Sequence, residues 1–203
     1  DVPVDPELES TALSLRALKA EGPALLMPAP GSTHRQLGNL FGHRQRIELA
    51  LAGRPLASLR ELGELLAAIK EPRWPGNLRQ ALAHWPELAQ LAHVAPRRVR
   101  EAAFDEDVRS GDAVDLSVLP VQRCWPGDAG KLITFGLVIT RGTRQPRQNV
   151  AIYRQQVIGR NRVIMRWLPH RGGALDFADW QAARPGQPFP VLVAIGADPA
   201  TLL

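Results

Sequence analysis

Apolar residues in the first part of the chain recur at the three- and four-residue spacing that is typical of amphipathic helices. The first such series begins near Leu8 and predicts a helix that ends at Gly22-Pro23. A second helix is predicted over about residues 43–52. A third is predicted from Ser58, which forms a capping-box pattern with the glutamate three residues later. The short apolar run 24–27 predicts a buried strand.

In the second half, apolar and polar residues alternate in the pattern that predicts β-strands. The predicted strands cover residues 121–124, 132–140, 150–158, 162–168 and 191–195. A helix is predicted over residues 172–183, and another begins at Asp198-Pro199, where an aspartate N-cap precedes proline. Because the sequence stops as this last helix begins, we expect it to be the N-terminal part of a longer protein.

The pattern changes in a segment rich in acidic residues and glycine, around residues 104–115. We therefore expect a boundary near residue 110, between an N-terminal domain of residues 1–110 and a second domain of residues 111–203. The predicted fold class is α+β. A small, mainly helical α/β domain is followed by a strand-rich domain.

The composition is that of a globular protein, with 45% hydrophobic and 22% charged residues among 203. No apolar run approaches the roughly 18–20 residues that span a bilayer, which excludes a transmembrane protein for this stretch. Cys124 is the single cysteine, so an internal disulfide framework and a cysteine-based zinc site are excluded. This cysteine usage favours a reducing, cytosolic location.

The positive charge is concentrated in one segment. Residues 129–175 contain no Asp or Glu but hold one lysine and eight arginines, a net charge of +9. The remaining residues, 16 basic and 20 acidic, sum to −4, so the net charge of +5 hides a strong asymmetry. Such a field indicates an anionic partner: a phosphate, a carboxylate or a nucleic acid.

Residues 150–168 are predicted to form an antiparallel hairpin whose turn is centred on Arg160. In that register Arg154 faces Arg166, and like charges in opposite positions destabilise a hairpin. The two guanidiniums therefore either extend into water, as on an ordinary basic sheet face, or hold an anion between them. Nucleic acid is the weaker candidate, because the hairpin contains only two aromatic residues and no RNA-recognition motif.

The same register brings Asn149 close to His170 and Arg171. An amide oxygen, an imidazole and guanidiniums together suit a phosphate and its divalent metal. Asn149 and Arg154 are five residues apart, so a bulge or a strand edge is required to bring them to one side. The pair Gly172-Gly173 then allows close backbone approach, and the helix that follows would present free N–H groups to an anion.

Four runs in this region resemble the UbiD family: RQNVAIYRQQ (147–156), IGRN (158–161), IMRWL (164–168) and HRGGALD (170–176). Within the family, the similarity is to the polyprenyl-4-hydroxybenzoate carboxy-lyases of ubiquinone synthesis. Shorter matches occur at residues 3–6, 22–26, 39–42, 124–130, 139–142 and 196–201. The resemblance therefore extends over essentially the whole chain.

The resemblance implies a non-oxidative decarboxylase that removes CO₂ from a polyprenyl-4-hydroxybenzoate-type aromatic acid. It implies prenylated FMN as the cofactor, with Mn²⁺ and a monovalent cation such as K⁺ at the cofactor phosphate. It also implies that residues 111–203 form the first part of a split β-barrel flavin-binding domain.

The resemblance also assigns roles to individual residues. Asn149 and His170 resemble metal ligands of the family, and Arg154 resembles the catalytic arginine beside the substrate carboxylate. The positions that resemble cofactor contacts are Ile152, Tyr153, Arg154, Arg166, Trp167, Leu168, Arg171 and Gly172. Phe135 stands where many relatives have tryptophan, which alters the wall of the pocket.

The third metal ligand of the family is a glutamate, and its proton-donating acids lie further along in a motif that this sequence does not contain. We therefore expect these 203 residues alone to be inactive. The implied partners are a flavin prenyltransferase that supplies the cofactor and further copies of the chain in a homo-oligomer. The implied location is the cytoplasm, either free or peripheral at the inner face of the cell membrane.

Three alternative functions stay open at this point. The first is a UbiD-like decarboxylase of another aromatic or unsaturated acid. The second is a flavin-binding or assembly module without catalysis. The third is a basic nucleic-acid-binding domain.

Overall fold

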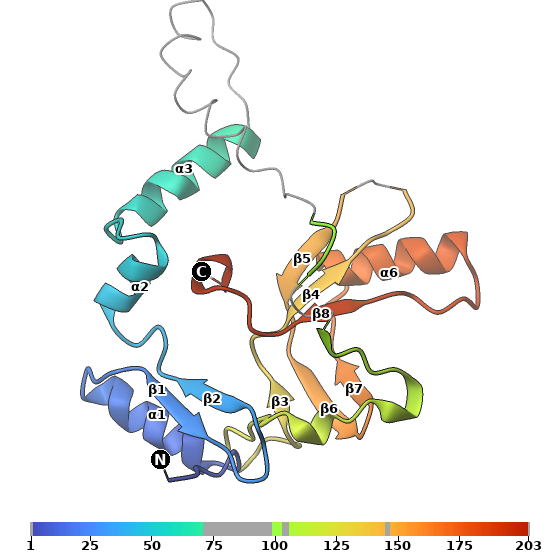
Figure 1. Cartoon of the computed structure of the whole chain (residues 1–203). Coiled ribbons are helices and arrows are strands. Elements are labelled where there is room, and N and C mark those ends of the chain that lie inside the picture. The colour runs from blue at the N-terminus through green and yellow to red at the C-terminus, as the bar shows by residue number, and fades with distance from the viewer. Residues whose placement is uncertain (1, 71–98, 103–105, 145–146, 203) are drawn as a thin grey trace, which may run out of the picture. The chain divides into compact units, whose positions relative to one another are not determined.

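The structure is a computed structural model that describes residues 2–70, 99–102, 106–144 and 147–202. The chain divides into two compact units, one made of residues 1–46 and 110–203 and the other of residues 47–109. The first unit contains both the N-terminal helix and every strand found among the described residues (Figure 1). The predicted division into domains 1–110 and 111–203 stays a prediction.

The N-terminal segment of the first unit is a helix packed on a β-hairpin. Helix α1 (Glu9–Lys19) contacts the antiparallel strands β1 (Leu25–Pro28) and β2 (Arg35–Gly38). The contact is close because a Cβ on Gly38 would lie 2.2 Å from the Ser14 hydroxyl oxygen. The predicted helix after Leu8 is confirmed. The strand predicted at 24–27 is also present, but it is not buried as expected, since Leu26 is 58% exposed.

Two further helices follow, α2 (Arg44–Ala50) and α3 (Ser58–Lys70). Both were predicted, the second from its start at Ser58. Arg46 fixes the beginning of α2, because its guanidinium donates hydrogen bonds of 3.0 Å to three backbone carbonyls, those of Gly22, Asn39 and Leu40. Two 3₁₀ turns, η2 (Gly111–Ala113) and η3 (Leu116–Val118), begin the second half of the chain.

The second half forms two open antiparallel sheets of three strands each. One has the order β3 (Leu132–Ile133), β6 (Gln155–Gly159) and β7 (Arg162–Met165). The other has the order β5 (Asn149–Ile152), β4 (Leu137–Thr140) and β8 (Leu192–Ala194). The mixed α+β class is confirmed, and the described strands do not close into a barrel.

The chain crosses between these sheets three times, by short connections from β3 to β4 and from β5 to β6, and through α6 from β7 to β8. The predicted single strands 132–140 and 150–158 are therefore each broken in two. The two short connections meet at Gln155, which is fully buried, and at Gly136, where a Cβ would lie 3.0 Å from the Gln155 Oε1 atom. A side chain at position 136 would require Gln155 and Val193 to shift by a few tenths of an ångström.

The predicted hairpin register is correct in its middle and wrong at both ends. Gln155 pairs with Met165 and Val157 with Val163, as expected for a turn centred on Arg160, but the register shifts next to the turn, where Gly159 pairs with Arg162. Val150 and Ile152, however, pair with β4 of the other sheet rather than with residues 168–170. Tyr153 and Arg154 lie between β5 and β6 and belong to neither strand. The sequence analysis required a break in the strand between Asn149 and Arg154, and this break does occur.

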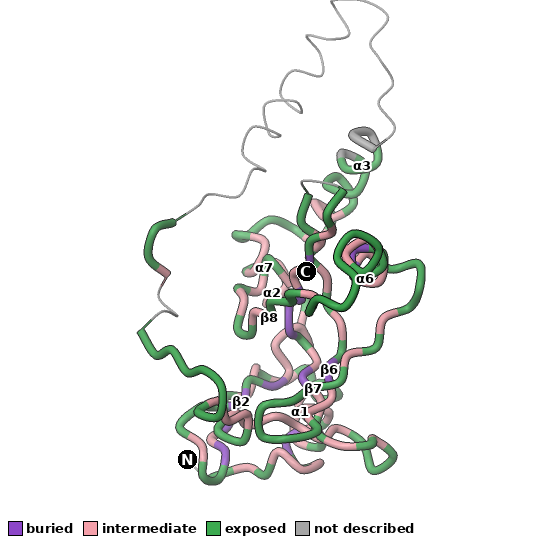
Figure 2. The backbone as a smooth tube through the Cα atoms, turned by 90° about the vertical axis from the view of Figure 1, so that its right-hand side faces the viewer, coloured by how far each residue is buried: buried purple, intermediate pink, exposed green. Residues whose placement is uncertain are grey.

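Helix α6 (Gly172–Ala183) has the predicted bounds and packs against β4 and β5. Aromatic rings link its outer part to the chain on either side, with Trp167, Phe177 and Phe189 in mutual contact at centroid distances of 5.6–6.0 Å. The short α7 (Pro199–Leu202) starts where the Asp-Pro signal predicted it. Figure 2 shows short buried stretches separated by intermediate and exposed ones. None of the helices in the described ranges has the length and apolar character of a membrane span.

Candidate functional site

Asn149, the first predicted metal ligand, lies at the start of β5 directly opposite Thr140 of β4. Its side-chain Nδ2 donates a hydrogen bond of 3.1 Å to the Thr140 hydroxyl. That hydroxyl donates in turn to the Asp176 carboxylate on α6, at 2.7 Å. The amide of Asn149 is therefore attached, through Thr140, to a buried acid.

The oxygen of the same amide lies at the beginning of α6. A Cβ on Gly172 would lie 2.0 Å from the Asn149 Oδ1 atom, so glycine is the residue that leaves room for this oxygen. His170, the second predicted metal ligand, is exposed in the turn two residues before Gly172. The structure thus places the Asn149 oxygen next to the segment that carries His170.

Tyr153 and Trp167 form an aromatic wall at the same end of α6. Their ring centroids are 6.1 Å apart in an edge-on arrangement, and Trp167 packs against Gly173, where a Cβ would lie 3.1 Å from its ring. The Tyr153 hydroxyl accepts a hydrogen bond of 3.0 Å from the Gly173 N–H. This helix N–H, expected to be free for an anion, is therefore already used.

Arg154 and Arg166 lie just outside the paired ends of β6 and β7, next to the pair Gln155 and Met165. Both are exposed, and within the described ranges neither guanidinium makes an ion pair or hydrogen bond. Arg171 is the exposed N-cap residue of α6. The remaining predicted cofactor contacts, Ile152 and Leu168, are 42% and 40% exposed, although both are large apolar residues.

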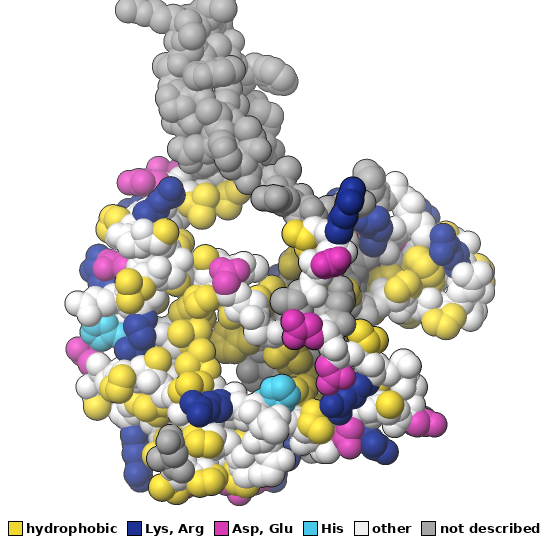
Figure 3. Space-filling model, viewed as in Figure 1, with side chains coloured by type: hydrophobic (Ala, Val, Ile, Leu, Met, Phe, Trp, Pro, Cys, Tyr) yellow, Lys and Arg dark blue, Asp and Glu magenta, His cyan; other side chains and the backbone are white. Residues whose placement is uncertain are grey.

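Three other arginines of the basic segment are bound to acids of the fold. Arg144 pairs with Asp179 at 2.8 Å, Arg147 with Asp176 at 3.6 Å, and Arg160 with Asp115 at 3.0 Å. On the face shown in Figure 3, acidic side chains accordingly lie among basic ones. The arginines thus fall into a structural group and a group without an acidic partner in the described part of the chain, which contains Arg154, Arg166 and Arg171.

Asp179 fixes the loop between β4 and β5 against α6. Its carboxylate accepts hydrogen bonds from the backbone N–H groups of Thr143 and Arg144 and from the Thr143 hydroxyl. The hydrogen bond from the Arg144 N–H is the largest of the causes that lower the pKa of this carboxyl below its ordinary value. Asp176 and Asp179 stand one turn apart and face the same loop.

Thr140 and Asp176 lie inside two runs that resemble the family, 139–142 and 170–176, but neither was assigned a role from the sequence. One signal was available for Asp176, which is the first acid after the acid-free segment and is three residues from Gly173, the other buried position of α6. A carboxylate on the buried side of a helix requires a partner, and this points to a polar residue on the adjacent strand. Thr140 itself carries no such signal.

The residues present fit a hard divalent cation in part. Amide oxygens are ligands that such cations accept, and a side chain oriented by second-sphere hydrogen bonds is typical of metal sites. Asn149 satisfies both conditions, and His170 can supply an imidazole. Among the described residues, no group of three His, Cys, Asp or Glu side chains is close enough to hold a metal. The donors found here are therefore one amide and one imidazole.

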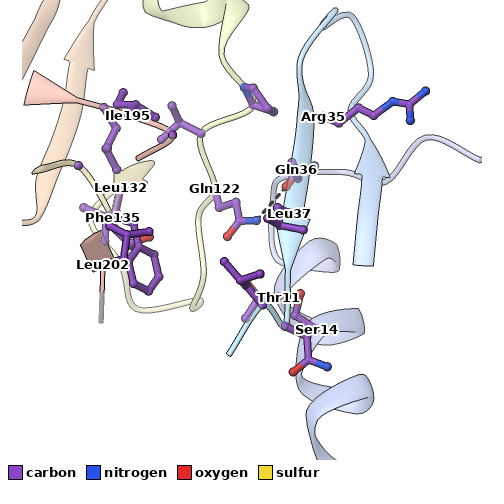
Figure 4. Close-up of a pocket in the computed structure, with 18 of the residues that line it drawn as sticks. Thr11, Ser14, Arg35, Gln36, Leu37, Gln122, Leu132, Phe135, Ile195 and Leu202 are labelled. Atoms are coloured by element: carbon purple, nitrogen blue, oxygen red, sulfur yellow. Dashed lines mark hydrogen bonds between the residues drawn. The ribbon is translucent and has the colours of Figure 1, made fainter. Parts of the chain in front are cut away.

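A separate cavity of about 840 Å³ lies in the same unit, between α1, β2 and the segments around residues 119–122 and 132–136 (Figure 4). It contains the hydrogen bond of 3.0 Å from Gln122 Nε2 to Gln36 Oε1. Phe135 lines it and is in ring contact with Phe41 at 6.4 Å. None of the predicted metal or cofactor residues lines this cavity.

Comparison with protein families gives two matches. Residues 1–66 match the 3-octaprenyl-4-hydroxybenzoate carboxy-lyase N-terminal domain. Residues 97–203 match the Rift-related domain of the same carboxy-lyase family, UbiD. Together the two matches include every residue of the candidate site.

Solved structures give the same result. The chain is 22% identical to the vanillic acid decarboxylase of Sedimentibacter hydroxybenzoicus in its closed form, with a TM-score of 0.72, over 100% of this chain and 40% of that one. It is 26% identical to HmfF of Pelotomaculum thermopropionicum in complex with FMN, with a TM-score of 0.69 over 98% and 39%. It is 27% identical to the apo 3,4-dihydroxybenzoic acid decarboxylase of Klebsiella pneumoniae, with a TM-score of 0.66 over 98% and 39%.

The first of these similarities establishes the fold alone. The chain spans about two fifths of the length of the solved structures that it matches. One family model accounts for more than half of the chain and a second for most of its N-terminal part. The chain therefore belongs to the UbiD family.

Proposed function

We propose that this chain is the N-terminal part of a decarboxylase that uses prenylated FMN and a divalent metal, Mn²⁺. The observation that carries the proposal is the position of the Asn149 amide oxygen, which lies against Gly172 beside the predicted ligand His170. Arg154 and Arg166, both exposed and unpaired within the described residues, supply cations for anionic groups. Related structures contain FMN in one case and prFMN in another.

Loss of CO₂ from an unsaturated carbon leaves an electron pair that no amino-acid side chain can accept, and prenylated FMN supplies this capacity when it is bound. The residues of this chain bind and orient the cofactor, the metal and the substrate. Asn149 and His170 would hold Mn²⁺, which together with K⁺ would neutralise the charge of the cofactor phosphate. Arg166 and Arg171 bind that phosphate, and Arg154 holds the substrate carboxylate at the reacting position.

The remaining cofactor contacts form the walls of the site. Tyr153 and Trp167 provide an aromatic surface that is stiffened by the bond from Gly173 to the Tyr153 hydroxyl. Ile152, Leu168 and Gly172 provide apolar surface and close backbone approach. Exposed apolar residues of this kind are what a planar, largely apolar ring system requires.

The proposed substrate is a polyprenyl-4-hydroxybenzoate-type acid in ubiquinone biosynthesis. The description of the matching family models supports it, since both name a 3-octaprenyl-4-hydroxybenzoate carboxy-lyase. The similar enzyme of Klebsiella pneumoniae is named for 3,4-dihydroxybenzoic acid, which makes a smaller aromatic acid the second candidate. We also propose a homo-oligomer, a flavin prenyltransferase as cofactor supplier, and a location in the cytoplasm or at the inner face of the cell membrane.

The test is purification of the complete protein after co-expression with a flavin prenyltransferase and with Mn²⁺ supplied. We expect a bound modified-flavin absorbance spectrum and CO₂ release from one acid of a panel that includes prenylated and unprenylated 4-hydroxybenzoates. Bound flavin without CO₂ release from any acid would instead support the flavin-binding or assembly module. Absence of any bound flavin would refute the proposal.

Arg154→Lys tests the role of the substrate-binding arginine. Lysine keeps the charge but loses the bidentate geometry that orients a carboxylate. We expect flavin binding to be largely unchanged and turnover of the complete protein to fall by about 100-fold, a loss of the size attributed to misplaced reacting groups. Arg162→Lys is the matched control in the same hairpin and is expected to leave turnover unchanged. Equal turnover in both variants would exclude the proposed role of Arg154.

A further inference from the structure

Two hydrogen bonds run from Asn149 through Thr140 to Asp176, and we call them the buried relay. The order of donors and acceptors in this relay determines the orientation of the Asn149 amide. The Thr140 hydroxyl donates its single proton to the Asp176 carboxylate, at 2.7 Å. Because this proton is used in the bond to Asp176, the Thr140 hydroxyl oxygen can only accept a further hydrogen bond. The group of Asn149 that faces it must therefore be the NH₂ group.

Flipping the Asn149 amide would place its oxygen against the Thr140 oxygen, with no proton between them. Thr140 and Asp176 are 2% and 5% exposed, so water does not compensate for such a loss. The buried relay thus selects one of the two amide orientations. In this orientation Oδ1 points away from Thr140 and lies against Gly172.

The Asn149 oxygen accepts no hydrogen bond from any residue in the described ranges. Asp176 is held in place from its other side, because its Oδ1 atom is 3.6 Å from the Arg147 guanidinium. The relay therefore leaves one amide oxygen with its lone pairs available, in a fixed position at the start of α6. This is the arrangement by which second-sphere groups orient the ligands of a metal.

We propose that Thr140 and Asp176 are positioning residues that present the Asn149 oxygen to the divalent metal. The inference rests on the proposed function, since it takes Asn149 as a metal ligand. The proposal gives the relay a role in metal binding, in addition to its structural role of joining β4 to α6. A merely structural relay would affect the stability of the fold but not the affinity for the metal.

The experiment compares Thr140→Val, which keeps the shape but removes the hydroxyl, with the parent protein. The readout is Mn²⁺ affinity in the complete protein with FMN, followed by the electron paramagnetic resonance signal of free Mn²⁺. Loss of second-sphere partners typically weakens metal binding by about 10–100-fold, and we expect a change in this range. Thermal unfolding is measured alongside as a check of the fold.

Thr140→Ser and Thr140→Ala form a second, matched pair in case the valine variant does not fold. Both lose the methyl group, so a difference between them reports the hydroxyl alone. We expect the serine variant to bind Mn²⁺ within a few-fold of the parent and the alanine variant to bind at least about tenfold more weakly. Equal Mn²⁺ affinity in the serine and alanine variants would overturn the proposal.

Asn149→Ala separates this inference from the proposed function. If that variant binds Mn²⁺ as well as the parent does, Asn149 is not a ligand and the proposed metal site fails. If Asn149→Ala abolishes binding while the Thr140 variants bind normally, the metal site stands and only the positioning role fails. Weakened binding in Asn149→Ala, Thr140→Val and Thr140→Ala, but not in Thr140→Ser, supports both.

Discussion

At the scale of single residues, the site depends on which atom of a side chain faces which neighbour. The sequence, through its family resemblance, pointed to Asn149 and His170 as ligands, because their identity and order are visible in the chain. It did not point to Thr140, which is one of several threonines and acquires its role only when β4 pairs with β5 and α6. Residues that act through another residue are found from contacts, and such contacts are not local in sequence.

Gly172→Ala tests the space occupied by the Asn149 oxygen. The added Cβ would lie 2.0 Å from Oδ1, so the short Asn149 side chain must rotate and give up its bond to Thr140. We expect weaker Mn²⁺ binding and a fall in the free energy of unfolding of about 1 kcal/mol, the net value of one hydrogen bond. Isothermal titration with Mn²⁺ and urea unfolding measure the two effects.

The control for this substitution is Gly63→Ala, in α3, where an added Cβ meets no atom within 4 Å. Alanine stabilises helices relative to glycine by up to about 1 kcal/mol, so this variant is expected to be as stable as the parent or more stable. A Gly172→Ala protein with parental Mn²⁺ affinity would show that the Asn149 oxygen is not held where the structure places it.

At the scale of elements, local signals predicted the helices well and the strands less well. The bounds of α6 and the start of α3 lie at residues that carry local signals, because Gly172 begins α6 and Ser58, which was predicted as the N-cap, is the first residue of α3. The break inside 132–140 coincides with Gly136, and an isolated glycine in a strand pattern is a local signal for such a break. The break inside 150–158 had no glycine signal, and only the parity of Asn149 and Arg154 indicated that it was needed. Which sheet a strand joins depends on partners that are far away in sequence.

Asp179→Ala tests the attachment of the β4–β5 loop to α6. Removing the carboxylate leaves the Thr143 and Arg144 N–H groups without their acceptor, so we expect several-fold faster hydrogen exchange at these two amides at neutral pH. Asp107→Ala removes a comparably charged but highly exposed acid, paired with Arg109, and should leave both amides unchanged. Exchange measured by NMR decides between these outcomes.

The same contact predicts a pH dependence. The pKa of Asp179 is lowered chiefly by the hydrogen bond from the Arg144 N–H, so its carboxylate is preferentially ionised in the folded state. Its contribution to stability is therefore complete above the ordinary aspartate pKa of about 3.9 and disappears as the pH falls through the lowered value. The amide shifts of Thr143 and Arg144 should report a midpoint below the ordinary value. A midpoint at or above it would contradict the hydrogen bonds described.

At the scale of the whole chain, the basic residues of the arginine-rich segment fall into two groups, those that pair with acids of the fold and those that are available to a ligand. Acids of the fold neutralise Arg144, Arg147 and Arg160, while Arg154 and Arg166 have no such partner within the described residues. The sequence predicted that the charge serves an anion but not which arginines are available to it. That distinction depends on Asp115, Asp176 and Asp179, which are up to 45 residues away from their partners in the chain.

A comparison of FMN with riboflavin tests whether the unpaired arginines bind a phosphate. Hydrogen bonds to charged groups contribute about 1.5–3 kcal/mol, so FMN should bind at least about tenfold more tightly than riboflavin, which lacks the phosphate. Added salt should weaken FMN binding and leave riboflavin binding nearly unchanged. Fluorescence quenching of each flavin gives both affinities, and equal affinities at low salt would exclude phosphate recognition.

The crossing from β5 to β6 limits how the chain can vary in length. Only Tyr153 and Arg154 separate the two strands, and successive residues of a strand point to opposite faces. An insertion or deletion of one residue here would exchange the two faces of β6, expelling Gln155 from the corner that it fills beside Gly136. It would also shift Arg154 relative to Asn149. The fold therefore constrains the number of residues in this connection, in addition to the roles proposed for the side chains of Tyr153 and Arg154.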